Sequence, residues 1–359
     1  MQSSLACSRY RTGKVAMLRR IALTVGALLL VLASACTRTT EEKAATEPGR
    51  TEGVVKVYNG RHYGIEPVFD EFTRQTGIKV EFTTGGDSEL RERIQAEGPN
   101  TSADVYMAAD AANLYLAAQA GLLRGVESDI LSRTIPSNYR DPEGRWFGLS
   151  KRVRAIAYSA DRVSASDLST YEALGEPRWR GRLCLRPATN AYTKSLVAGL
   201  IATRGREQAE AIVRSWVAKD PVYIDSDVDI VKTIAAGRCD VAIINHYYLA
   251  RLLDQDPTLP VKIFWPDQAG RGAHVNVSGA GVTSWAKNPE AAQRLIEWLA
   301  TSGQQSFAAA NFEFPIVPSA KPHPLLDSWG PFREDSTWVG EYGRLQAEAV
   351  TLMDQVGYK

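Results

Sequence analysis

The stretch VKVYNGRHYGIEPVFDEFTRQTGIKVEF, residues 55–82, decides the fold of this chain. Its first residues alternate valine with other residues and predict a strand that ends at Asn59. Residues 67–72 place apolar side chains at helical spacing, and residues 78–82 alternate apolar and charged residues as a second strand does. A strand, a helix and a strand in this order form a βαβ unit, which predicts a parallel α/β architecture.

The α/β pattern continues through the rest of the chain. We expect further strands at 103–107, 183–185 and 241–244, and helices at 88–96, 111–120, 195–202, 209–216 and 289–301. Two more strands, 154–158 and 274–279, are expected to cross from a first lobe to a second lobe and back. The sequence therefore predicts two α/β lobes, joined by crossover strands, with a ligand cleft between them. No repeat of 20–50 residues is visible.

Composition and charge narrow the class of protein. A chain of 359 residues that is 44% hydrophobic and 23% charged has the composition of an ordinary globular protein of roughly two domains. Its formal net charge is only +1. Phosphate backbones are bound by concentrated basic surfaces, so this balance gives no reason to expect nucleic acid as a partner.

Residues 1–35 have the form of a signal peptide. Two arginines precede an apolar run over residues 21–32, which is shorter than the roughly 20 residues that a membrane-spanning helix needs. Residues 32–36, LASAC, resemble a bacterial lipoprotein cleavage site, at which Cys36 becomes the acylated first residue. Ordinary secretion with cleavage at the same bond is the alternative. Met17 is the more natural start of this signal.

The segment after the signal reads as a tether. Residues 36–53 lack apolar periodicity, so we expect a flexible link between the membrane and a fold that begins at Val54. Loss of residues 1–35 removes five basic and no acidic side chains, which lowers the formal net charge from +1 to −4.

Export changes how the cysteines are interpreted. Cys184 and Cys239 are the cysteines that remain in the folded part, and each lies in an apolar run that predicts a buried strand. An exported protein can form disulfides, so we expect these two residues to be bonded. Two buried free thiols are the alternative.

Enzyme motifs are scarce in the sequence. It contains no Gly-x-Ser-x-Gly elbow, Walker loop, His-Glu-x-x-His or Cys-x-x-Cys motif. Four histidines do not suggest an imidazole-rich metal centre. We therefore expect a binding protein and not an enzyme. The rival from another class is an exported hydrolase that uses cleft carboxylates such as Asp87, Asp104 and Asp227.

Four tyrosines follow predicted strands and precede predicted helices. Tyr63 follows the first strand, Tyr192 lies just past Asn190, a suitable helix N-cap, and Tyr247 and Tyr248 follow the strand at 241–244. The carboxyl ends of parallel strands face the ligand crevice, so all four phenols can reach one cleft. A helix N-terminus also favours a negative group and eases conversion of phenol to phenolate.

Phenolate oxygen is a hard anionic ligand, and among biological ions Fe³⁺ suits it best. Four phenolates and Fe³⁺ carry a net charge of −1, which Arg152 is placed to offset from outside the ligand set. The same residues also have interpretations that involve no metal. A Tyr–Tyr pair is more often packing, cleft aromatics can stack on a sugar, and Arg152 can belong to a solvated charge run.

Four segments resemble the ferric-iron-binding subunits of bacterial ABC importers, of the FutA and FbpA type. Residues 57–63, VYNGRHY, are similar to the opening segment in which His and Tyr approach iron, and residues 186–192, RPATNAY, to a segment with a further tyrosine ligand. Residues 245–252, NHYYLARL, resemble the Asn-x-Tyr-Tyr segment, and residues 270–279, GRGAHVNVSG, the return segment. The sequence departs from the family pattern at Asn59 and at residues 225–229, DSDVD.

The resemblance implies a two-lobed type II periplasmic binding protein, similar to a transferrin lobe, with Fe³⁺ as its cargo. It implies ligands at Tyr63, Tyr192, Tyr247 and Tyr248, with His62 as an optional fifth, and no synergistic anion. Some relatives carry cysteines at the positions of Cys184 and Cys239, which favours the disulfide. The partners that it implies are an ABC permease with its ATPase, and we expect a monomer.

We assign the lobes accordingly. The N-terminal lobe is expected to comprise residues 54–152 and 275–318, and the C-terminal lobe residues 153–274 and 319–359. Hinge closure would bring the ligands of the two lobes together around the metal. The same fold with another solute, such as a sugar or an organic anion, is the nearest alternative.

Overall fold

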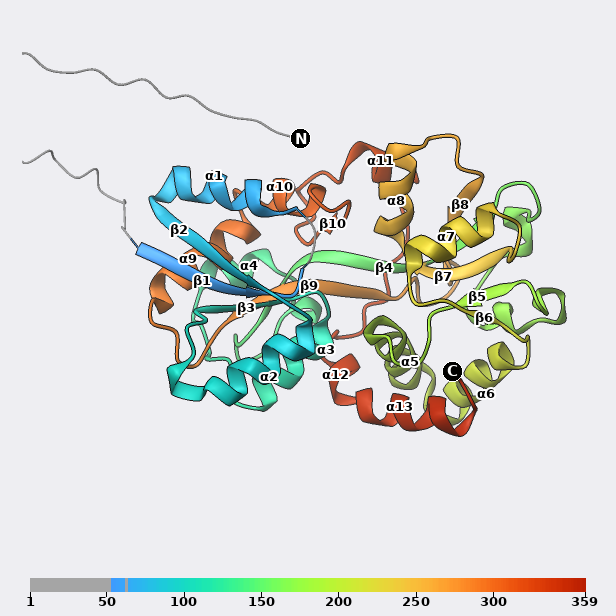
Figure 1. The fold of residues 1–359 in the computed structure, drawn as a ribbon, viewed down its shortest axis with the longest axis horizontal. Coiled ribbons are helices and arrows are strands. Elements are labelled where there is room, and N and C mark those ends of the chain that lie inside the picture. The colour runs from blue at the N-terminus through green and yellow to red at the C-terminus, as the bar shows by residue number, and fades with distance from the viewer. Residues whose placement is uncertain (1–52, 62–63) are drawn as a thin grey trace, which may run out of the picture. The chain divides into compact units, whose positions relative to one another are not determined.

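The computed structural model describes residues 53–61 and 64–359, and one mixed sheet runs through it (Figure 1). Its hydrogen-bonded order is β2-β1-β3-β9-β4-β7-β5-β6, and β8 and β10 also pair with β4. The strands are β1 (Gly53–Asn59), β2 (Ile78–Thr84), β3 (Val105–Ala108), β4 (Phe147–Ser159), β5 (Leu183–Leu185), β6 (Val222–Tyr223), β7 (Val241–Asn245), β8 (Val261–Phe264), β9 (Val275–Val282) and β10 (Phe314–Pro315).

Helices follow most of the strands, as the sequence predicts. Side chains cap several of them: Asp110 accepts from the N–H of Ala112 at the start of α3, for example. The helices are α1 (Glu66–Thr76), α2 (Asp87–Glu97), α3 (Ala111–Gln119), α4 (Asp129–Thr134), α5 (Ala191–Arg204), α6 (Arg206–Val217), α7 (Asp227–Ala235), α8 (His246–Gln255), α9 (Pro289–Ala300), α10 (Gln304–Ala309), α11 (Pro324–Asp327), α12 (Glu341–Arg344) and α13 (Gln346–Gln355). Within the described residues, none of these helices combines the length and the apolar character that crossing a membrane requires.

Two strands connect two groups of elements. Figure 1 shows β4 and β9 running between a group that contains β1, β2 and β3 and a group that contains β5, β6, β7 and β8. Strand β4 pairs with β9 as far as Val153 and with β7 from Arg154 onward. The two predicted crossover strands are therefore present, with the second extended to Val282.

The sheet is not purely parallel, which corrects the sequence-based expectation. Within each group the strands β1, β2 and β3, and β5, β6 and β7, pair in parallel. The crossover strands run antiparallel to their neighbours, since β9 pairs antiparallel with β3 and β4 pairs antiparallel with both β9 and β7. A strand that returns between two groups enters the sheet in the opposite direction, and that reverses its pairing.

The crossover strands pair along their backbones and are bridged by one phenol. The hydroxyl of Tyr171 donates to the carbonyl of Arg154 in β4 (2.5 Å) and accepts from the N–H of His274 beside β9 (3.0 Å). A Cβ atom at Gly281 of β9 would lie 2.3 Å from the carbonyl oxygen of Arg145. Glycine is therefore required at this position so that the two backbones can approach.

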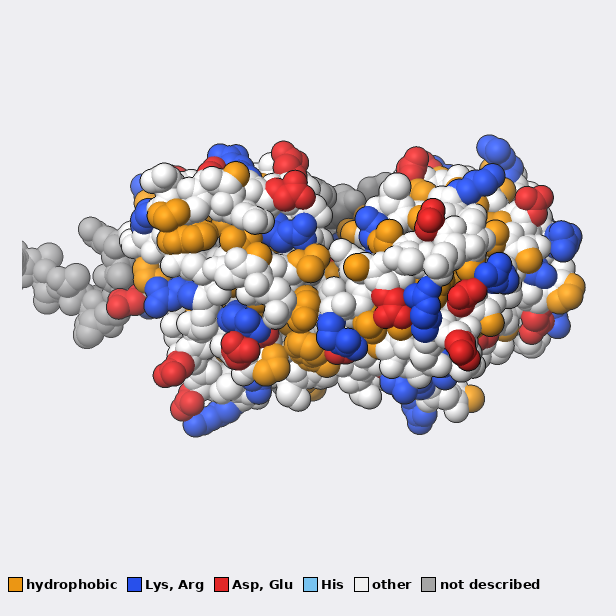
Figure 2. Space-filling model, turned by 90° about the horizontal axis from the view of Figure 1, so that it is seen from below, with side chains coloured by type: hydrophobic (Ala, Val, Ile, Leu, Met, Phe, Trp, Pro, Cys, Tyr) orange, Lys and Arg blue, Asp and Glu red, His pale blue; other side chains and the backbone are white. Residues whose placement is uncertain are grey.

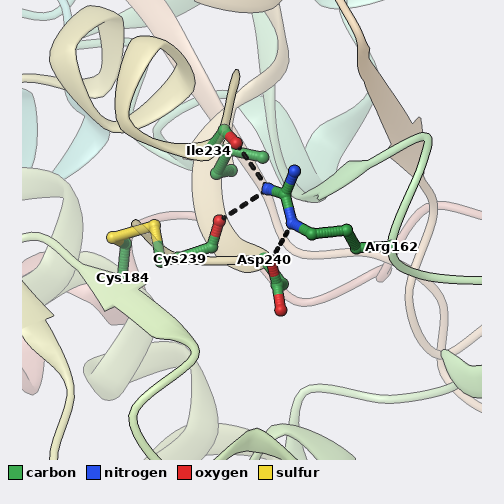
Figure 3. The surroundings of a disulfide bond; sticks show 5 residues. All are labelled: Arg162, Cys184, Ile234, Cys239 and Asp240. Carbon is green, nitrogen blue, oxygen red and sulfur yellow. Dashed lines mark hydrogen bonds and ion pairs between the residues drawn. A yellow bond between two sulfur atoms is a disulfide. The ribbon is translucent and has the colours of Figure 1, made fainter. Parts of the chain in front are cut away.

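Cys184 of β5 and Cys239, just before β7, form a disulfide in the structure (Figure 3). Both residues are buried, and their Cα atoms are 5.9 Å apart. Beside them, Arg162 donates to the carboxylate of Asp240 (2.5 Å) and to the carbonyl of Ile234 (2.7 Å), which closes the turn into β7 (Figure 3). The structure thus contains the bonded form and not the two free thiols.

Two more expectations from the sequence concern the charge on the surface and the N-terminal segment. Figure 2 shows acidic and basic side chains interspersed over the face seen from below, with no region of a single sign. That face therefore lacks the concentrated basic field that binds phosphate backbones.

The predicted signal at 1–35, the acylation site Cys36 and nearly all of the tether at 36–53 lie outside the described residues, as do His62 and Tyr63.

Candidate functional site

Three of the four predicted tyrosines lie in the first turns of helices that follow strands. Tyr192 is in the first turn of α5, and the side chain of Asn190 caps this helix by accepting from the N–H groups of Tyr192 (3.0 Å) and Thr193 (3.2 Å). Tyr247 and Tyr248 are in the first turn of α8, which begins directly after β7. The strand ends therefore position these phenols as the sequence suggests.

Arg152 brings the phenols of two different helices to one place. It lies in β4, and its Nη1 is 3.2 Å from the hydroxyl of Tyr192 while its Nη2 is 2.5 Å from the hydroxyl of Tyr247. The guanidinium also lies over both rings, 5.1 Å and 4.5 Å from their centroids. The ring of Tyr248 packs against that of Tyr247 at 4.3 Å between centroids, with the ring planes tilted by 37°. Arg152 is only 2% exposed, so it is not part of a solvated charge run.

A pocket adjoins this cluster. Tyr192 and Tyr248 line it together with Arg186, which comes from the same group of elements, and Gly60 and Asp87 supply the opposite wall from the group of β1 to β3. Gly60 lies two positions before His62 in the sequence. The pocket thus has walls from both groups of elements, as a ligand cleft between lobes requires.

The surroundings of the cluster shift the pKa values of its phenol and its guanidinium. Burial raises the pKa of Tyr247 well above its usual range, although the guanidinium of Arg152 acts in the opposite direction. Burial lowers the pKa of Arg152, but the phenols of Tyr192 and Tyr247 and the carboxylate of Glu313 more than compensate, and the net shift is upward. The shifts therefore favour a charged Arg152 beside a neutral Tyr247.

Two buried charged residues of the cluster were not predicted. Glu313 forms ion pairs with Nε of Arg152 (3.2 Å) and Nη2 of Arg61 (3.6 Å), and accepts hydrogen bonds from Ser150 and, at 2.6 Å, from Asn311. Arg61 directly precedes His62. A basic residue in the motif RHY was visible in the sequence, but no local pattern indicates that Glu313 faces it.

The carboxylates of the rival hydrolase hypothesis are dispersed. Asp104 accepts from the backbone N–H groups of Lys56, Lys287 and Asn288, and Asp227 forms ion pairs with Arg154 and Arg186. Asp87 alone of the three lines the pocket, and burial raises its pKa to about 7. In residues 53–61 and 64–359, no group of three or more His, Cys, Asp or Glu side chains is arranged to hold a metal ion.

Two α/β groups linked by crossover strands, with a ligand pocket walled by both, define a two-lobed solute-binding protein. Residues 68–332 match the family described as bacterial extracellular solute-binding protein, and the chain belongs to this family.

Two iron uptake proteins are similar to this chain over most of its length. The chain is 36% identical to Iron uptake protein A1 of Synechocystis sp. over 357 residues, which cover 95% of this chain and 98% of the relative. It is 39% identical to Iron uptake protein A2 of the same organism, over 85% of this chain and 90% of that relative.

Solved structures give the same result. A structure of the Trichodesmium protein FutA (IdiA) in complex with iron and citrate is 40% identical, with a TM-score of 0.82, and the match covers 86% of this chain and 100% of that one. The ferric binding protein from Campylobacter jejuni is 32% identical, with a TM-score of 0.80 and coverage of 85% and 100%. The two-lobed fold and the resemblance to proteins of the FutA and FbpA type are thereby confirmed.

Proposed function

We propose that this protein is the extracytoplasmic Fe³⁺-binding subunit of an ABC iron importer, which captures the ion in the cleft and delivers it to the permease. The observation that carries the proposal is the convergence of Tyr192, Tyr247 and Tyr248 around Arg152 beside the pocket. Phenolates are hard anionic donors that suit Fe³⁺. The relatives named as iron uptake and ferric binding proteins support the same cargo.

The proposed ligands are Tyr63, Tyr192, Tyr247 and Tyr248, with His62 as an optional fifth and no synergistic anion. In this proposal Fe³⁺ supplies the charge that ionises the phenols, and Arg152 remains outside the ligand set and offsets the negative charge of four phenolates. The hydrogen bonds from Arg152 to Tyr192 and Tyr247 support this role, because a guanidinium donates to a phenolate more strongly than to a neutral phenol.

Binding is proposed to close the two lobes. The N-terminal lobe comprises residues 54–152 and 275–318 and carries His62 and Tyr63, and the C-terminal lobe comprises residues 153–274 and 319–359 and carries the other three ligands. The change of partner along β4 at Val153 supports a boundary here. Metal that bridges both lobes stabilises the closed state by its extra contacts there.

The remaining features of the proposal concern the cell. We propose that the protein is not an enzyme, acts as a monomer, and is held at the outer face of the membrane by a lipid on Cys36. Its partners are the permease and ATPase of the importer. Family membership among extracellular solute-binding proteins supports the location outside the cytoplasm.

A titration of the metal-free protein with a ferric chelate tests the metal assignment. We expect a visible charge-transfer band that saturates at one iron per protein. Tyr247→Phe should weaken iron binding by more than the 10–100-fold that is typical when a residue merely supporting a metal ligand is lost. Tyr223→Phe is the matched control, because Tyr223 lies in β6, packs on Tyr358 and does not line the pocket. Equal iron affinity in Tyr247→Phe and the wild type would refute the assignment.

A further inference from the structure

One carboxylate holds two buried guanidiniums beside the tyrosine cluster. Glu313 precedes β10, and its side chain lies between Arg61, two residues after β1, and Arg152 of β4. The three side chains are at most 2% exposed. Arg61 is held in place from its other side as well, because it donates to the carbonyl of Phe307 (2.9 Å) and stacks over that ring at 3.9 Å.

Together the three groups carry one net positive charge that water does not screen. Two guanidiniums are always protonated at physiological pH, and one carboxylate offsets one of them. Arg152 brings positive charge next to the tyrosine cluster, because it donates hydrogen bonds to the hydroxyls of Tyr192 and Tyr247. Arg61 adjoins His62 and Tyr63 in the sequence. Glu313 is therefore coupled through Arg152 to the phenols of Tyr192 and Tyr247.

We propose that Glu313 sets the preference of the cleft for ferric over ferrous iron, an inference that rests on the proposed function. Fe³⁺ carries one more positive charge than Fe²⁺, so any added positive charge nearby destabilises the ferric complex more than the ferrous one. Glu313 cancels one of the two guanidinium charges. Without it, both would act on the metal, and the balance would move toward Fe²⁺.

The pKa of Glu313 is shifted in the opposite direction from the pKa values of the other carboxyls that interact with Arg152. Burial raises the pKa of Asp87 to about 7, and burial also raises the pKa of Asp110. Burial raises the pKa of Glu313 too, but Arg61 and Arg152 outweigh it, and the net shift is downward. Hydrogen bonds from Ser150 and Asn311 fix its orientation. Glu313 is the positioning residue that supplies a lasting negative charge.

The test is a redox titration of the iron-loaded full chain, followed through the charge-transfer band. Glu313→Gln keeps the shape but removes the charge, and we expect a higher Fe³⁺/Fe²⁺ midpoint potential than in the wild type. One unit charge at about 10 Å and an effective dielectric constant near 20 corresponds to a shift on the order of tenfold in the ratio of ferrous to ferric dissociation constants. Arg61→Met should shift the potential in the opposite direction.

A double variant and a conservative variant complete the design. Arg61→Met/Glu313→Gln removes one charge of each sign and should return the midpoint to near the wild-type value, and Glu313→Asp should do the same by retaining the carboxylate. The double variant keeps the net charge of the group at one positive charge, because Arg152 remains. If Glu313→Gln alone does not fold, the difference in midpoint between Arg61→Met and the double variant measures the effect of the Glu313 charge. Shifts of the same sign in Arg61→Met and Glu313→Gln, or a displaced midpoint in both the double and the Asp variants, would overturn the inference.

The two proposals fail in different ways. If the wild type gives no charge-transfer band with ferric chelate, the proposed function is wrong. If the wild type gives the band but Glu313→Gln folds, binds iron and has an unchanged midpoint, the proposed function stands and the role of Glu313 is refuted.

Discussion

Breaking the disulfide between Cys184 and Cys239 should destabilise the folded protein by about 4 kcal/mol. The bond closes a loop with a sequence separation of 55 residues. In the chain-entropy account, the cross-link reduces the freedom of the unfolded chain by an amount that grows with the logarithm of loop length, and 55 residues correspond to about 4 kcal/mol at room temperature. Both cysteines are buried, so reductant should reach the bond slowly without denaturant.

The assay is urea unfolding of the oxidised and the reduced wild type, with the free energy of unfolding taken from each transition. Comparing the two redox forms of one sequence leaves core packing unchanged. The control is Cys184→Ala/Cys239→Ala measured with and without reductant, which should give identical curves. If oxidised and reduced wild type unfold with free energies within about 0.5 kcal/mol of each other, the loop-closure reasoning is wrong.

Two further predictions concern the crossover strands. Gly281→Ala should lower the free energy of unfolding by at least about 1–3 kcal/mol, because the new Cβ would meet the carbonyl oxygen of Arg145 at 2.3 Å. The control in thermal unfolding is Gly53→Ala, because no atom lies within 4 Å of a Cβ at that position. Equal losses of stability in the two variants would contradict the argument. Burial lowers the pKa of His274 from 6.5 to about 3, so between these pH values the unfolded state binds more protons than the folded state. The folded state therefore has its full stability from a neutral His274 above pH 6.5. As the pH falls toward 3, the free energy of unfolding decreases by at most about 1.4 kcal/mol per pH unit. His274→Leu should therefore lose less stability than the wild type between pH 6.5 and pH 4 in denaturant titrations, and parallel declines would exclude this role.

Local patterns predicted most of the secondary structure. The helix expected at 111–120 is Ala111–Gln119, and the helix expected at 289–301 is Pro289–Ala300. Apolar spacing and caps act within a few residues, so a single sequence contains them. The position of three tyrosines at strand ends followed from the same local reading, and Asn190 caps its helix as expected.

Features that depend on distant contacts could not be predicted in this way. The direction of β4 and β9 relative to their neighbours depends on which strands they meet, and local patterns did not predict that both pair antiparallel. Glu313 could not be recognised as the partner of Arg61, because the two residues come from opposite ends of the described chain. A buried ion pair leaves no periodic signal, so only the folded arrangement identifies it.

The regular course of β4 from Ser150 onward limits how this protein can change. From Ser150 to Tyr158 the strand passes from its pairing with β9 to its pairing with β7 without an extra residue. Side chains alternate along a strand, so inserting one residue near Val153 would exchange the faces of every later position and turn the second group of elements over relative to the first. Residues around the pocket can therefore be exchanged singly, whereas an added residue near Val153 would need a second bulge to absorb it, beside the irregularity that β4 already has between Gly148 and Ser150.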